Sequence, residues 1–170
     1  MKPEIWYDWD NNKNQSVFEN NFYNLHAPDI KEDTTMDANM KKRNELLAKT
    51  VIKGLESRNM SGYYAQDKEA ALKQALELIP NGSTIAMGGC MSAHEIGLVK
   101  ALQDGEYNYI DRAKLEPREG LMAAYDADFF LSSANAVTDD GVLVNIDGNS
   151  NRVSCIAQGP KKVIFIVGIN

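Results

Sequence analysis

Three short polar groups stand out because their residue types could bind a small anion. The first, GGCMSAHE, covers residues 88–95 and begins with a pair of glycines. The second, SSAN, ends at Asn135, and the third, NIDGNSNR, covers residues 145–152. Glycine lets backbone approach a ligand closely, and an arginine guanidinium binds carboxylate or phosphate. The candidate ligand-binding residues are Gly88, Gly89, Ser92, Glu95, Asn135, Asn145, Asp147, Asn149 and Arg152.

Each polar group also has a purely structural explanation. Two glycines before a helix are common in tight strand-to-helix turns, and asparagine suits a turn. Glu95 fits a helix cap of the form S-x-x-E that begins at Ser92. Asp147 and Arg152 could pair with each other and pin a loop. The sequence therefore leaves ligand contact and loop structure both open at these positions.

Other kinds of site lack their sequence signatures. The glycines match neither G-x-G-x-x-G nor a P-loop, so a dinucleotide or ATP is not expected. No Ser-His-Asp set, carboxylate pair or metal-ligand spacing is present, and we assign no catalytic residue, metal or cofactor. His94 is isolated, which favours a surface role. Cys90 and Cys155 form neither a CxxC pair nor a disulfide framework, and they fit a reducing compartment.

Charge and hydropathy indicate which classes of partner the protein can bind. The chain has 18 basic and 24 acidic residues, for a net charge of −6, without the basic clusters that nucleic acid or an anionic membrane would require. The apolar run at 163–167 is too short to cross a bilayer, and the N-terminus carries no signal pattern. We expect a cytoplasmic protein that binds a small anionic metabolite, with no nucleic acid partner and no membrane insertion.

The elements that must position these groups alternate along the chain. From the hydrophobic periods and end signals, helices are predicted at 37–59, 67–79, 92–102 and 117–125, and strands at 62–66, 83–87, 107–110, 128–132, 142–146 and 163–167, while 152–157 fits either type. This alternation predicts an α/β fold with a Rossmann-like, open, mostly parallel sheet and helices on both faces. Ligands of such sheets bind beyond the carboxyl ends of the strands. All three polar groups are predicted there, and the helix after Gly89 would add its N-terminus as an anion site.

The first 36 residues differ from the rest. They hold both tryptophans, Trp6 and Trp9, many asparagines and no sustained helical or strand period. This pattern predicts an irregular arm at 1–36, followed by one α/β domain at 37–170. The aromatic residues of the arm favour packing on the domain or on another copy of the chain, as in a homo-oligomer. A disordered tail is the alternative.

Four stretches in the remaining chain carry a family resemblance. They are VIKGLESRNMSGYYAQDKEAALKQALELIPNGSTIAMGG, SAHEIGLVKAL, FFLSSANAVTDDGVLVNIDGNSNRV and GPKKVIFIVGIN. In this order they resemble the LUD domain found in lactate-utilisation protein C and the YkgG-like proteins. The resemblance implies a fold similar to the NagB, ribose-5-phosphate isomerase and CoA-transferase group. In that group the loop equivalent to NIDGNSNR borders the ligand site, which favours Asp147, Asn149 and Arg152 as site residues.

The same resemblance suggests a metabolic role. Lactate-utilisation protein C is associated with iron-sulfur partner proteins in the oxidation of L-lactate to pyruvate. The resemblance therefore implies an accessory or ligand-binding component of that oxidation. The alternative is a stand-alone enzyme that acts on a phosphorylated sugar or a CoA thioester.

Overall fold

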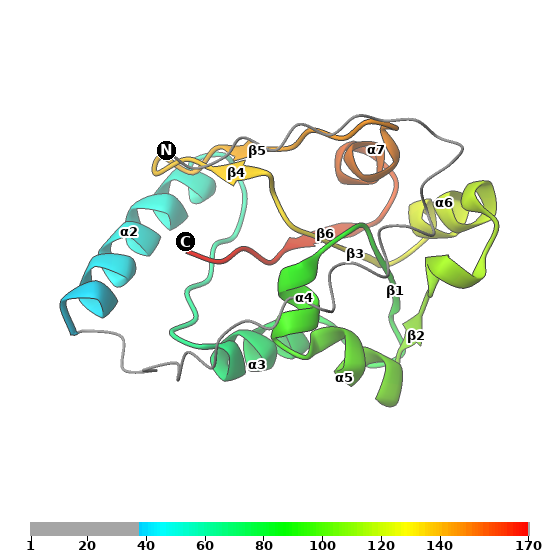
Figure 1. Ribbon diagram of the computed structural model, residues 1–170, viewed down its shortest axis with the longest axis horizontal. Coiled ribbons are helices and arrows are strands. Elements are labelled where there is room, and N and C mark those ends of the chain that lie inside the picture. Colours follow the sequence, from blue (N-terminus) through cyan, green and yellow to red (C-terminus); the bar gives the residue numbers. More distant parts are fainter. Residues whose placement is uncertain (1–37, 170) are drawn as a thin grey trace, which may run out of the picture. The chain divides into compact units, whose positions relative to one another are not determined.

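A parallel four-stranded sheet forms the centre of the domain. The computed structural model describes residues 38–169, which belong to one compact unit (Figure 1). The predicted arm at 1–36 lies outside these residues, and the predicted domain boundary stays a prediction. The strand order is β2-β1-β3-β6, and every pairing in this sheet is parallel. Its strands are β1 (Thr84–Met87), β2 (Asn108–Tyr109), β3 (Phe129–Ser132) and β6 (Lys162–Phe165).

Helices cover both faces of this sheet, as Figure 1 shows. The helices on one face pack on Ile85 and Leu131, and those on the other face pack on Ala86 and Phe130. Neighbouring residues of one strand point to opposite faces, so the apolar residues of β1 and β3 supply both cores. The predicted α/β class with an open, mostly parallel sheet is confirmed. The first face carries α3 (Lys68–Leu78), α4 (Met91–Glu95) and α5 (Leu98–Asp104), and the second carries α6 (Pro117–Tyr125) and α7 (Asn151–Ala157).

Several sequence patterns that mark the start or the burial of an element are found at the predicted positions. The Asp67 carboxylate accepts a hydrogen bond of 2.8 Å from the Ala70 N–H and caps α3. Pro117 occupies the first turn of α6, where its missing N–H costs nothing. All four residues of β3 are buried, which are three apolar residues and Ser132. The segment that fitted either a helix or a strand is the helix α7.

A small antiparallel hairpin stands apart from the main sheet. Its strands are β4 (Ala136–Val137) and β5 (Leu143–Val144), and the C-terminal end of α2 (Ala38–Glu56) lies against its turn. The strand predicted over 142–146 is present in part, as β5, but it belongs to this hairpin and not, as the alternation had predicted, to the parallel sheet. Its apolar residues Val142 and Ile146 are exposed, at 38% and 70%.

Two further predictions were wrong. Residues 62–66 form no strand, and Tyr63 is 54% exposed. The S-x-x-E cap does not form either, because the helix begins one residue earlier, at Met91, with Cys90 at the cap position. That helix then ends at Glu95, since Gly97 adopts a positive φ of 78° and separates α4 from α5. Within residues 38–169, no helix is both long and apolar enough to span a bilayer.

Candidate functional site

The carboxyl edge of the sheet brings two of the three polar groups together at the centre of the strand order. The strand β1 has β2 on one side and β3 on the other, so the chain changes direction between β1 and β3. Such a switch point is where open α/β sheets place their ligands. Gly88 follows β1 here, and its N–H donates to the Leu131 carbonyl of β3 over 3.0 Å. Ser133, from the second polar group, follows β3 directly.

Arg152 joins the third polar group to this edge. Its Nη1 donates to the Ser133 carbonyl over 2.7 Å. Its Nη2 donates to Asn135 Oδ1 over 2.5 Å and to the Ile146 carbonyl over 3.0 Å. Asn135 Oδ1 also accepts the Ile146 N–H over 2.9 Å. The guanidinium therefore fastens the hairpin to the end of β3.

Asp147 pins the same loop through backbone contacts. Its Oδ2 accepts the N–H groups of Arg152 and Val153 over 2.9 and 2.8 Å, and both lie at the start of α7. The Val153 N–H is the largest cause that holds the pKa of the Asp147 carboxyl below its usual range. The predicted pinning is present, but it runs from the carboxylate to the main chain and leaves the guanidinium for other partners. Asp147 therefore fills the place at the start of α7 where an external anion would bind.

Arg112 is a further residue of this edge, and the sequence analysis missed it. The main-chain ladder from β2 to β1 runs from the Asn108 N–H to Ser83 and from the Ile110 N–H to Ile85. The next bond of this series would join the Arg112 N–H to the Met87 carbonyl. The chain instead turns into the short helix η1 (Arg112–Lys114), and the side-chain Nη1 of Arg112 donates to that carbonyl over 3.4 Å. The signal was available, since Arg112 follows a predicted strand as the three polar groups do.

The two glycines of the first polar group differ in what surrounds them. Gly88 is buried, and a Cβ there would lie 2.6 Å from the ring of Phe130 and 3.1 Å from Cγ of Arg152. Gly89 is exposed, and a Cβ there would meet nothing within 4 Å. Gly88 is thus explained by close packing against the Phe130 ring and the Arg152 stem, whereas Gly89 faces open space.

We call Gly88, Arg112, Ser133, Asn135 and Arg152 the carboxyl-edge cluster. The ion pairs found within residues 38–169 include neither arginine of the cluster. Their hydrogen-bond partners are uncharged oxygens. Neither guanidinium has a carboxylate as a hydrogen-bond partner among the described residues, although the Asp147 carboxylate interacts electrostatically with Arg152. Positive side chains at one edge of an acidic protein suit an anion.

The other predicted site residues do not join these contacts. Glu95 is exposed, and its carboxylate lies 3.6 Å from Lys68 Nζ. Ser92 lies inside α4, which is too short to offer a strong N-terminal dipole. Asn149 is exposed in the loop before α7. Asn145 Oδ1 is buried and lacks a hydrogen-bond partner among the described residues.

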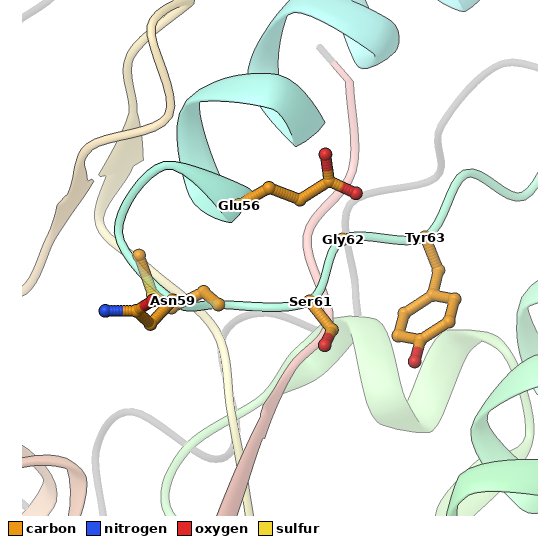
Figure 2. A pocket seen from close by; sticks show the side chains of 6 residues that line it. Glu56, Asn59, Ser61, Gly62 and Tyr63 are labelled. Carbon is orange, nitrogen blue, oxygen red and sulfur yellow. The ribbon is translucent and has the colours of Figure 1, made fainter.

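Two surface hollows lie elsewhere on the domain. The first, of about 480 Å³, is lined by Glu56 and by residues 59–63, and Figure 2 shows Ser61 and Tyr63 beside it. The second, of about 370 Å³, lies at the amino ends of the strands and includes Asp128 and Lys161. Neither includes a residue of the carboxyl-edge cluster. The first hollow contains the carboxylate of Glu56, which opposes an anion, whereas the second contains Asp128, paired with Lys161, and also Lys162.

The described residues offer little for metal or nucleophilic chemistry. Within 38–169, no three His, Cys, Asp or Glu side chains come close enough to hold a metal ion. Cys90 and Cys155 are both buried, and burial raises the pKa of each thiol. A buried thiol with a raised pKa is a poor nucleophile at neutral pH.

Comparison with known proteins gives the family. Neither the curated proteins nor the solved structures include a match to this chain. The family model described as "LUD domain" matches residues 48–170, which include all of β1 to β6 and every residue of the carboxyl-edge cluster. This match covers well over half of the 170 residues. The chain therefore belongs to the LUD domain family.

Proposed function

We propose that this protein is an anion-binding, accessory component of the oxidation of L-lactate to pyruvate, working beside iron-sulfur partner proteins. Membership of the LUD domain family supports the metabolic setting. The observation that carries the binding role is the pair of guanidiniums at the carboxyl edge, both bonded to uncharged oxygens only. L-lactate and pyruvate are small carboxylates, so both suit such a site.

The hydrogen-bonding capacity of the two arginines supports this role. A guanidinium has five N–H donors, and Arg112 uses one of them in a long bond to the Met87 carbonyl. The others have no partner among residues 38–169. A carboxylate would form charge-assisted bonds with them, which are about twice as strong as bonds between neutral groups. Arg112 is thus the main ligand group, whereas Arg152 supplies positive charge and also holds the loops in place.

The test is calorimetric titration of the full chain with L-lactate, pyruvate and inorganic phosphate. We expect Arg112→Gln to weaken carboxylate binding about 10- to 100-fold, the effect of losing a charged hydrogen bond. Arg43→Gln is the matched control, because Arg43 is exposed on α2 and contacts only Met40 among the described residues. The melting curve of each variant shows whether the fold is retained. Equal affinity in Arg112→Gln and wild type would contradict the proposal.

The accessory role has its own test. A tagged copy of the full chain, expressed in its native cells, is expected to recover iron-sulfur proteins of lactate oxidation. The purified chain alone is expected to leave sugar phosphates and CoA thioesters unchanged. Steady turnover of either compound by the purified chain would instead favour a stand-alone enzyme.

A further inference from the structure

The strand β5 of the hairpin has a free edge. In the part of the chain that the structure describes, β5 pairs with β4 alone. The main-chain groups of the even-numbered residues in 142–146 point inward, where they bond to Thr138, Asn135 and Arg152. Successive main-chain groups of a strand point to opposite edges, so those of Leu143 and Asn145 point outward, away from β4. An outward row of unpaired N–H and C=O groups is a template for another strand.

Exposed apolar side chains line the same run. Val142 is 38% exposed, Val144 is 37% exposed and Ile146 is 70% exposed. Side chains at alternate positions of a strand point to the same face, so these three form one row. Proteins usually protect an edge strand with a charge or a proline, but residues 141–146, GVLVNI, contain neither. Both the side chains and the main chain of this edge therefore suit a partner strand.

This edge is complementary to a second copy of itself. If two β5 strands meet antiparallel with the twofold axis at Val144, Leu143 of each copy faces Asn145 of the other. The two residues then exchange both of their outward main-chain hydrogen bonds. Val144 faces Val144 of the second copy, and Val142 faces Ile146 of the second copy. The two apolar rows therefore join across the axis, and such cross-strand pairs stabilise a sheet.

Charge favours this position of the axis. Asp147 directly follows the apolar run, and with the axis at Val144 it faces Gly141 of the second copy. An axis one residue earlier, at Leu143, would place Asp147 opposite Asp139 of the second copy. Like charges directly opposite each other destabilise a sheet. An axis one residue later would place the Asp147 carboxylate opposite the apolar side chain of Leu143.

We propose that β5 pairs with β5 of a second copy of this chain, which joins the two hairpins into one antiparallel sheet of the order β4-β5-β5-β4. A two-stranded hairpin is marginally stable alone, and further strands stabilise it. The pairing run is short, and interfaces below about 1,200 Å² are at the weak end of protein–protein interfaces. The dimer is therefore in reversible equilibrium with the monomer. This inference does not depend on ligand binding at the carboxyl-edge cluster.

Disulfide cross-linking of the full chain tests the register. Opposed residues of a non-hydrogen-bonded antiparallel pair have Cα atoms about 4.5 Å apart, which a disulfide can span. Under mild oxidation we expect Val144→Cys to form a linked dimer at least about tenfold faster than Val142→Cys, because only position 144 faces itself. An equimolar mixture of Val142→Cys and Ile146→Cys is expected to cross-link as fast as Val144→Cys. Cys90 and Cys155 are buried and do not compete.

Sedimentation equilibrium measures the dimer without a cross-link, and circular dichroism shows that each variant keeps its fold. Val144→Lys is expected to raise the Kd of the dimer at least about tenfold, because it brings two ammonium groups face to face. Met122→Lys, at a position 51% exposed on α6, is expected to keep the wild-type Kd. Equal cross-linking of Val144→Cys and Val142→Cys, or a wild-type Kd in Val144→Lys, would overturn the proposal. A wild-type chain that stays monomeric at every concentration would overturn it too.

Discussion

Some side chains of the carboxyl-edge cluster form several hydrogen bonds at once. Arg152 bonds to Ser133 and to two positions of the hairpin, and Asn135 Oδ1 accepts from two donors. Shared contacts of this kind make the effects of single substitutions non-additive. For that reason Arg112, with one hydrogen bond to the described chain, is the cleaner test of ligand binding.

Asp147 allows a prediction about pH. Its carboxylate holds the start of α7, and its pKa lies below the usual value, chiefly because of the Val153 N–H. A group with a lowered folded-state pKa adds stability above its unfolded pKa of about 3.9 and loses that contribution as pH falls. We expect Asp147→Ala to lower the free energy of unfolding by about 1 kcal/mol at pH 7. The difference from wild type should shrink below about pH 4.

Urea unfolding of both proteins at several pH values measures this difference. The control is Asp139→Ala, because Asp139 is exposed in the turn of the hairpin. A loss that stays constant from pH 7 to pH 3 would show that the charge of Asp147 is not responsible.

Residue types alone predicted part of the site. Gly88, Asn135, Asp147 and Arg152 do meet, because each follows a strand or precedes a helix at the same edge. Their pattern could not show that Asp147 bonds to main-chain N–H groups, since the sequence does not give the path of the loop. Ligand binding by these residues stays a prediction.

At the scale of elements, sequence patterns predicted helices and strands correctly where the packing of the domain favours the same structure. The Asp67 cap and the apolar run of β3 both produced the predicted elements. The S-x-x-E pattern failed because the helix begins one residue earlier, at Met91, with Cys90 at the cap position. The helix predicted to reach residue 102 is also divided in two, since Gly97 takes a left-handed conformation. The apolar run at 142–146 resembled a buried strand, yet its hairpin lies outside the main sheet. Sequence periodicity does not show which sheet a strand joins.

The contact of α2 with the hairpin depends on a glycine. A Cβ at Gly54 would lie 1.9 Å from the Asp140 carbonyl oxygen, which Arg58 Nη1 also binds over 2.9 Å. Alanine favours a helix over glycine by about 1 kcal/mol, but the backbone clash is the larger effect. We expect Gly54→Ala to lower the free energy of unfolding by about 1–3 kcal/mol.

Chemical denaturation followed by circular dichroism measures this loss. The control Lys53→Ala, on the exposed side of the same helix, should change stability by less than about 0.5 kcal/mol. A Gly54→Ala protein that is more stable than wild type would show that α2 can move away from the hairpin without cost.

At the scale of the whole molecule, the core of the central sheet is in contact with the carboxyl-edge cluster. Phe130 is fully buried in β3 and packs with Ala124 of α6 and Cys155 of α7. Its ring also limits the space at Gly88, next to Arg152. Phe130 thus belongs to the core and contacts the carboxyl-edge cluster at Gly88. Strand and helix alternation predicted this layered fold, because a parallel sheet needs a cover on both faces.

Phe130→Ala should therefore destabilise the whole domain. Removal of a buried ring costs about 3–5 kcal/mol, which is a large part of the stability of an ordinary domain, about 5–15 kcal/mol. Urea unfolding measures the loss, and Met122→Ala, at a position 51% exposed, is the control. A loss below about 1 kcal/mol would mean that the core refills the space, which is not expected of a close-packed interior.

The early end of β2 has a consequence for how this protein can diversify. Because β2 stops at Tyr109, a side chain meets the Met87 carbonyl where a main-chain N–H would otherwise stand. A main-chain group is the same in nearly every amino acid, whereas a side chain changes with a single codon. A substitution at position 112 leaves the main-chain hydrogen bonds between β1 and β2 in place. Under the proposed function, a point mutation at this one position would therefore be enough to change which anion the protein prefers.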